Sequence, residues 1–134
     1  MRIKYRIRDF QTKKYGGLAI QSKVDVENFK QLLGQYLRKW IPIKFGEYES
    51  RVKITYDSNY NGYGRERITI NDAKLFGRSG QFKTGEWIWL SIQQIDGEDT
   101  LIIEKEIDIS QVENLSEQIN DELKKPELKN FLDT

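Results

Sequence analysis

A cluster of side chains near the middle of the chain, Arg65, Glu66 and Arg67, can hydrogen-bond to the edges of nucleic-acid bases. In the major groove of DNA an arginine donates two hydrogen bonds to guanine, and a glutamate accepts one from cytosine. Two asparagines just before the cluster carry the amide group that pairs with adenine. The residues predicted to read bases are Asn59, Asn61, Tyr63, Arg65, Glu66 and Arg67.

The element that must position this cluster is a predicted β-hairpin over residues 51–70. Apolar and polar residues alternate through Val52 and Ile54 before the cluster, and through Ile68 and Ile70 after it. Such period-two alternation is typical of half-buried strands. Residues 57–66, rich in Asn, Gly and Tyr, are predicted to form a hairpin loop longer than two strands need. An ordinary solvated hairpin would explain the same pattern equally well.

A second feature is a row of cations near the amino terminus. Residues 2–8 alternate between an apolar face and a face that carries Arg2, Lys4, Arg6 and Arg8. Cations two residues apart on a strand lie roughly 6.5–7 Å from each other, so the row suits a phosphate backbone. Charges on an edge strand also prevent aggregation, which is the alternative explanation.

The segment after this strand is predicted to be a loop that reaches toward a partner. It carries two lysines and a tyrosine before Gly16 and Gly17, which allow a sharp bend or a close backbone approach. The residues expected to contact the DNA backbone or to form this first arm are Arg6, Arg8, Lys13, Lys14, Tyr15, Lys53, Thr69 and Arg78. Such contacts fix the register of a protein on DNA without reading its sequence.

The distribution of charge also favours an anionic partner. The net charge is +1, but residues 1–90 carry 18 Lys and Arg against 9 Asp and Glu, whereas residues 91–134 carry 4 against 12. Charge asymmetry of this kind points to an anionic partner for the first part of the chain. Two oppositely charged, merely solvated faces would give the same numbers.

Composition limits the chemistry that the chain can perform. The chain has no cysteine and no histidine, which excludes disulfides, thiolate nucleophiles and histidine-based catalytic or metal sites. Glu104 and Lys105 are adjacent and point to opposite faces of a predicted strand, so they do not match the spacing of a metal-dependent nuclease. A phosphate-binding Gly-rich loop with the Lys that follows it is also absent. We therefore expect no catalysis, cofactor or metal.

The remaining pattern predicts a mainly β protein of 134 residues with one principal domain. Further strands are expected at 18–20, 87–92 and 101–109, and a turn followed by a short strand is expected within 35–45. A short helix near 25–33 would be capped by Asp25. A C-terminal helix is expected near 111–124, so the chain divides into a domain at 1–110 and an acidic helix and tail at 111–134. No stretch is long and apolar enough to span a membrane, and we expect a cytoplasmic protein.

Part of the chain resembles a known family. Tyr56-Asp57-Ser58, then Arg65-Glu66 and Arg67-Ile68-Thr69, are similar to a motif of the amino-terminal specificity domain of EcoRII-type restriction endonucleases. Residues 16–20 with the following helix resemble the Gly-Gly loop, strand and helix of that domain, and residues 86–92 its next core strand. The similarity covers roughly residues 10–92. The central loop is about two residues shorter here, and the first arm lacks a histidine.

The resemblance implies an open, seven-stranded pseudobarrel of the plant B3 type, with two arms that grip the major groove of double-stranded DNA. The first arm would be residues 12–17 and the second residues 59–67, both directed at one duplex. Similar modules also precede McrBC-like restriction GTPases. The implied function is target recognition in a bacterial restriction system, with a nuclease or GTPase activity in another domain or subunit.

Three other interpretations remain open. Trp87 and Trp89, two residues apart on a predicted strand, would form the pocket of a reader of modified or flipped bases. Packing against neighbouring elements is the more common role for such a pair. The second interpretation is a non-catalytic module that binds an acidic protein. The third is an RNA-binding barrel.

Overall fold

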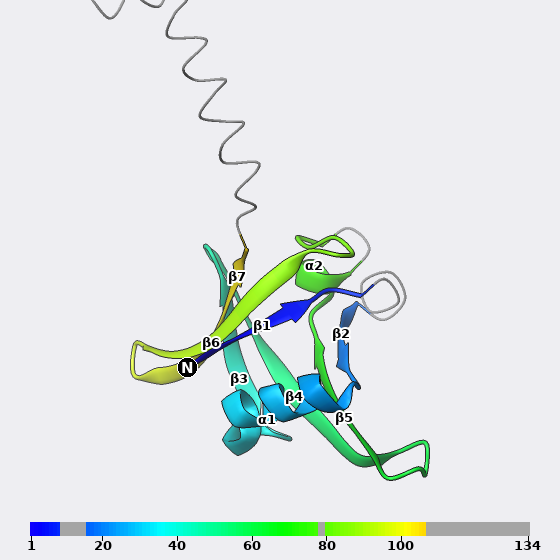
Figure 1. Ribbon diagram of the computed structural model, residues 1–134. Coiled ribbons are helices and arrows are strands. Elements are labelled where there is room, and N and C mark those ends of the chain that lie inside the picture. The colour runs from blue at the N-terminus through cyan, green and yellow to red at the C-terminus, as the bar shows by residue number, and fades with distance from the viewer. Residues whose placement is uncertain (9–15, 78–79, 107–134) are drawn as a thin grey trace, which may run out of the picture.

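The computed structural model describes residues 1–8, 16–77 and 80–106 (Figure 1). In chain order its elements are β1 (Arg2–Arg6), β2 (Gly17–Ile20), α1 (Lys23–Leu33), the 3-10 helix η2 (Gly34–Tyr36), β3 (Trp40–Phe45), β4 (Tyr48–Tyr60), β5 (Arg65–Asn71), α2 (Ala73–Phe76), β6 (Trp87–Ile95) and β7 (Glu98–Lys105). None of the helices in these ranges is long and apolar enough to cross a membrane. The predicted helix near 111–124, the tail to 134 and the division at residue 110 lie outside the described residues.

The seven strands form one mixed sheet in the order β1-β6-β7-β3-β4-β5-β2. All neighbouring strands are antiparallel except β3 and β7, which are parallel. The sheet is open because its edge strands β1 and β2 are not paired with each other. The prediction of a mainly β, seven-stranded protein with a short helix near 25–33 is confirmed.

The core follows the alternation of the sequence. In β1, β4, β5 and β6 the buried apolar positions alternate with more exposed neighbours, whereas all four residues of β2 are buried. In β4 the buried positions are Val52 and Ile54, and in β5 they are Ile68 and Ile70. The outward positions of these two strands are therefore free to bind a partner.

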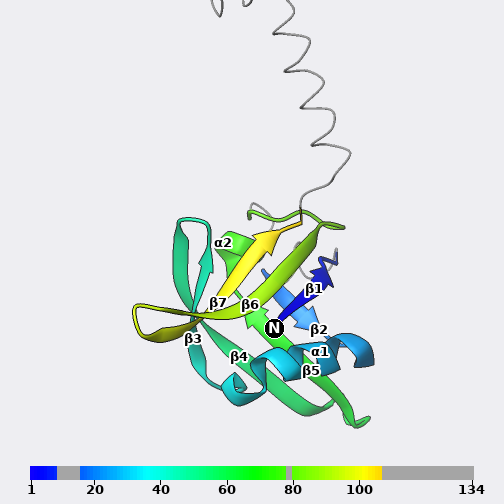
Figure 2. The same cartoon turned by 60° about the vertical axis from the view of Figure 1, so that its left-hand side comes forward.

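Helix α1 covers the open side of the sheet. Its buried face consists of Val26, Phe29, Leu32 and Leu33. It contacts both β1 and β5, and the ring of Phe29 meets that of Tyr5 edge to face at a centroid distance of 5.3 Å. Figures 1 and 2 show α1 lying beside β1 and alongside the β4–β5 hairpin. The helix thus connects the edge strand β1 with β5, the strand next to the other edge.

The start of α1 corrects one detail of the sequence prediction. The N-cap is Ser22, whose hydroxyl accepts a hydrogen bond from the amide of Asp25 at 3.2 Å. Asp25 lies in the first turn, where a carboxylate is favoured by the helix dipole. The prediction that Asp25 caps the helix was wrong, because the Ser22 hydroxyl accepts a hydrogen bond from the Asp25 amide and the helix begins earlier.

The central hairpin has longer strands and a shorter loop than the sequence predicts. Strand β4 continues to Tyr60 and β5 begins at Arg65, so only residues 61–64 connect them. The register shifts between Asp57 and Tyr60, which marks a bulge. Asn61, Gly62 and Gly64 have positive φ angles, a conformation that tight turns need and that glycine and asparagine adopt most readily. The hairpin extends beyond the body of the sheet (Figure 1).

Candidate nucleic-acid interface

The outward face of β4 and β5 carries four of the candidate residues, Lys53, Arg65, Arg67 and Thr69. Arg65, Arg67 and Thr69 alternate with the buried Ile68 and Ile70 and so lie on the side away from the core. Arg65 is exposed, and among the residues that the structure describes its side chain has neither a hydrogen-bond nor an ion-pair partner. It is available to a ligand.

Arg67 is held in place by an aromatic ring. Its guanidinium carbon lies 4.5 Å from the centre of the Tyr60 ring. Its Nε atom is buried and has no hydrogen-bond partner within the described ranges. Stacking on an aromatic face restricts the guanidinium and leaves its outer nitrogens able to donate in a fork. Tyr60, which the sequence prediction missed, faces outward because the bulge shifts the alternation of β4.

The tip of the hairpin uses one of the predicted base-reading residues for its own structure. The side-chain oxygen of Asn59 accepts a hydrogen bond from the amide of Gly64 at 2.6 Å. The amide of Asn59 in turn donates to the carboxylate of Asp57 at 2.9 Å. Asn61 is exposed, and Tyr63 is 82% exposed. Asn59 therefore shapes the tip, whereas Asn61 and Tyr63 are its most accessible polar and aromatic groups.

Glu66 lies on the opposite face of β5 from the two arginines. It accepts hydrogen bonds from Lys30 of α1 at 2.7 Å and from the Tyr56 hydroxyl at 2.5 Å. The hydrogen bond from Lys30, and then that from Tyr56, lower the pKa of Glu66. The hydrogen bonds with Glu66 likewise raise the pKa of Lys30 and that of Tyr56. Glu66 thus connects the hairpin to α1. The sequence predicts the Glu66 carboxylate beside the guanidinium groups of Arg65 and Arg67, but they lie on opposite faces of β5.

Replacing Glu66 with glutamine is expected to lower the melting temperature at neutral pH. Because folding lowers the pKa of Glu66, its contribution to stability is present above the pKa of the unfolded chain and is lost as the pH falls through the folded pKa. The difference in melting temperature between the wild type and Glu66→Gln should therefore shrink as the pH falls below the pKa of about 4.3 that a glutamate has in an unfolded chain. Thermal melts from pH 7 to pH 3 measure it, with Glu47→Gln, an exposed carboxylate, as the control. An equal difference at both ends of this range would contradict the assignment.

Two adjoining grooves lie between the hairpin and the start of α1. One, of about 510 Å³, is lined by Gln21, Ser22, Lys23, Val26, Glu27, Gly64, Arg65 and Glu66. The other, of about 270 Å³, is lined by Gln21, Tyr60, Asn61, Tyr63, Arg65 and Glu66. Gln21, Arg65 and Glu66 line both grooves. The amide of Gln21 is a second polar group beside Arg65 that sequence reasoning did not identify, because only the tertiary fold brings it to the hairpin.

The remaining outward positions extend this surface along the sheet. Lys53 is exposed on β4, opposite Trp40 of β3. Thr69 is half-buried between Thr55 of β4 and Ala19 of β2, and its carbonyl accepts a hydrogen bond from the Thr55 hydroxyl. Lys53 is therefore placed to contact a partner that lies along β5.

The first predicted arm joins the sheet at the other end of β5. Gly17 is paired with Asn71, and the carbonyl of Gly16 accepts a hydrogen bond from the amide of Asp72. Asn71 lies six positions after Arg65 in β5, which corresponds to about 20 Å along the strand. Lys13, Lys14, Tyr15 and Arg78 lie outside the described residues. The described end of the first arm, Gly16 and Gly17, therefore lies at the opposite end of β5 from the hairpin tip. The two do not meet at one point.

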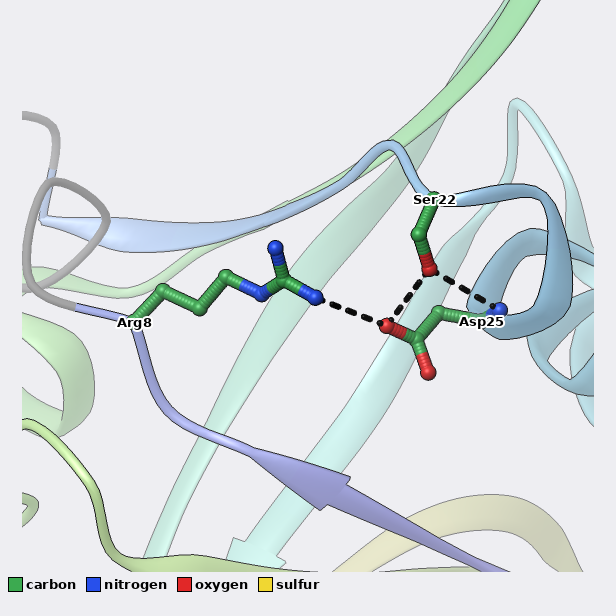
Figure 3. A network of polar contacts seen from close by, with 3 residues as sticks. All are labelled: Arg8, Ser22 and Asp25. Carbon is green, nitrogen blue, oxygen red and sulfur yellow. Dashed lines mark hydrogen bonds and ion pairs between the residues drawn. The ribbon is translucent and has the colours of Figure 1, made fainter.

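The amino-terminal cations lie on a different part of the sheet. Arg6 is exposed on the edge strand β1. Arg8 extends toward the start of α1, where its guanidinium lies 3.5 Å from the carboxylate of Asp25 (Figure 3). The same carboxylate accepts a hydrogen bond from Ser22 at 2.8 Å. Arg8 therefore links the segment after β1 to α1, and both arginines are exposed.

The structure offers no obvious centre for metal chemistry in the described ranges. No three side chains of Asp and Glu there lie close enough together to hold a metal ion. In the comparison with known proteins, no family model matches the chain and no curated protein matches it significantly. The evidence for the candidate interface is therefore the arrangement of its own side chains.

Proposed function

We propose that the chain binds double-stranded DNA with the outward face of the β4–β5 hairpin and reads bases with Arg65 and Arg67. The observation that carries this proposal is the pair of guanidinium groups on one face of a projecting hairpin. Arg65 is unpaired among the described residues, and Arg67 is fixed on Tyr60. Arginine that donates to guanine is the commonest base-specific contact in the major groove.

The proposed duplex lies along β5 and not only at the hairpin tip. The distance of about 20 Å between Arg65 and Asn71 corresponds to roughly six base pairs at 3.4 Å each. A duplex in this position would meet Arg65 and Arg67 at one end of β5 and would extend toward Gly16 and Gly17, the described part of the first arm, at the other. Lys53 would then contact a phosphate.

The finer description of the fold is part of the same proposal. A seven-stranded open sheet with a short helix that contacts both β1 and β5 is compatible with the B3-like pseudobarrel that the sequence resemblance implies. A role as the target-recognition part of a bacterial restriction system rests on that resemblance alone. Cleavage or translocation would then belong to a separate nuclease or GTPase domain or subunit.

A titration at two salt concentrations tests the proposed function. Fluorescence anisotropy of a labelled mixed-sequence duplex should show binding that weakens as salt rises, with a slope of about −0.9 in log K against log salt for each phosphate contacted. Absence of binding at low salt, or binding that salt leaves unchanged, would contradict the proposal.

Lys53→Ala is expected to weaken binding to all duplexes by a similar factor. The side chain is exposed on the proposed surface, and an ammonium group contacts phosphate as a point charge without reading the base. The salt slope should become shallower by about 1. The same titrations measure both quantities. Lys105→Ala serves as the control because Lys105 lies on β7 and pairs with Glu86, and it should leave the slope unchanged.

A further inference from the structure

A second surface, on strands β1 and β6, combines cations with tryptophans. In the antiparallel pairing of these strands Lys4 lies opposite Trp89 and Arg6 opposite Trp87, so these four side chains share one face. Arg2 lies on the same face of β1, two residues before Lys4. We call Arg2, Lys4, Arg6, Trp87 and Trp89 the cation–aromatic strip. The proposed duplex surface lies on other strands, β4 and β5.

The members of the strip are in contact with one another. The guanidinium carbon of Arg2 lies 3.9 Å from the centre of the Trp89 ring. The Nζ atom of Lys4 lies 4.7 Å from the centre of the Trp87 ring and 5.6 Å from that of Trp89. Cations and indole rings therefore alternate along the edge of the sheet, and a ligand that touches one kind of group also meets the other.

The strip is open toward the edge of the sheet and bounded on its other side by carboxylates. β1 is an edge strand, as the strand order shows and as can be followed in Figure 2. On the far side of β6, Glu104 lies opposite Trp89, and Glu106 forms an ion pair with Lys4 at 2.7 Å. The positive charge that remains available is that of Arg2 and Arg6, nearest the open edge. An anionic chain would therefore run along β1 and not across β7.

One end of the strip is hollowed. Arg6 and Trp87 line a groove of about 490 Å³ together with Ile7, Arg8, Asp25, Thr84 and Gly85. Trp87 is 42% exposed, whereas Ile88 and Leu90 of the same strand are completely buried. The groove gives space for a planar group against the indole, with the Arg6 guanidinium beside it.

We propose that the cation–aromatic strip binds single-stranded nucleic acid, with bases stacked on the indoles and phosphates contacted by Arg2 and Arg6. Aromatic side chains beside a row of cations are the combination that binds single strands without sequence preference, since every base has a stacking face. Trp87 and Trp89 are separated by two residues, or roughly 6.5–7 Å, so each can serve a different base. In a duplex these faces are covered by neighbouring base pairs, so a single strand fits the strip better.

The experiment uses the full chain and a short fluorescein-labelled oligo(dT). Trp87→Ala should weaken its binding by about tenfold, whereas Trp87→Phe, which keeps a stacking ring, should restore most of it. Arg6→Gln should weaken binding and reduce its salt dependence. Trp40→Ala is the matched control, because Trp40 is 65% exposed on β3 outside the strip, and it should change nothing.

The outcomes separate this inference from the proposed duplex binding. Arg65→Ala should leave the affinity for oligo(dT) unchanged, and Trp87→Ala should leave the affinity for duplex unchanged. Heparin, a polyanion without bases, should bind the wild type and Trp87→Ala equally well. Failure to bind oligo(dT), or equal losses from Trp87→Ala and Trp40→Ala, would overturn the inference even if the hairpin binds duplex DNA. Equal losses of heparin and oligo(dT) binding in Trp87→Ala would overturn the stacking role.

Discussion

Arg67→Ala is expected to weaken binding to the preferred duplex by about 1–3 kcal/mol and to relax the preference at one base position. The guanidinium of Arg67 is stacked on Tyr60 and faces outward from the hairpin. A guanidinium group held in this orientation donates two hydrogen bonds to the two acceptors of guanine. Without it, the protein no longer discriminates between base pairs at that position. Binding of a panel of duplexes that differ at one position each measures the effect.

Two further variants separate base reading from charge and from folding. Arg67→Lys keeps the charge without the planar fork, so it should lose the base preference while the salt dependence stays near that of the wild type. Arg51→Ala removes a cation from β4 that is paired with Glu98 at 3.1 Å, and it should leave the preference intact. If Arg67→Ala weakens every duplex equally, Arg67 contacts only the backbone.

Phe29→Ala is expected to lower the free energy of unfolding by about 3–5 kcal/mol. The ring is 1% exposed and packs edge to face on Tyr5, so it connects α1 to the edge strand β1. Its removal leaves a cavity where the helix packs on β1. Urea denaturation monitored by circular dichroism measures the change.

Val24 provides the matched control for this core substitution. It lies on the same helix but is 68% exposed, and Val24→Ala should change the free energy of unfolding by no more than about 0.5 kcal/mol. A loss below about 1 kcal/mol for Phe29→Ala would mean that the helix contributes little to holding the open side of the sheet together.

Much of the fold could be predicted because its strands obey a simple alternation. Ile3 and Tyr5 in β1 and Ile88 and Leu90 in β6 are buried where the period of two places them. The hairpin boundaries were harder to predict. Residues that favour turns, such as those from Asp57 to Tyr60, remain in the strand here because a bulge accommodates them. The parallel pairing of β3 with β7 depends on contacts between residues far apart in the sequence, which local patterns do not encode.

The hairpin that carries the candidate residues could be predicted from the sequence, but the division of those residues between its two faces was not predicted. The alternation that buries Ile68 and Ile70 also places Glu66 on their side of β5, and this signal was present in the sequence. Its partner Lys30 is 36 residues away in the sequence and could not be identified without the fold. The same applies to Gln21, which the packing of α1 brings to Arg65.

Selection from a pool of random duplexes at two salt concentrations shows whether the hairpin reads the base sequence of DNA. The wild type should enrich one short motif at both concentrations, because base contacts persist when phosphate contacts are screened. The double variant Arg65→Ala/Arg67→Ala should retain salt-sensitive binding but enrich no motif. A wild type that enriches no motif, or a double variant that enriches the same one, would contradict the account of the hairpin as the base-reading element.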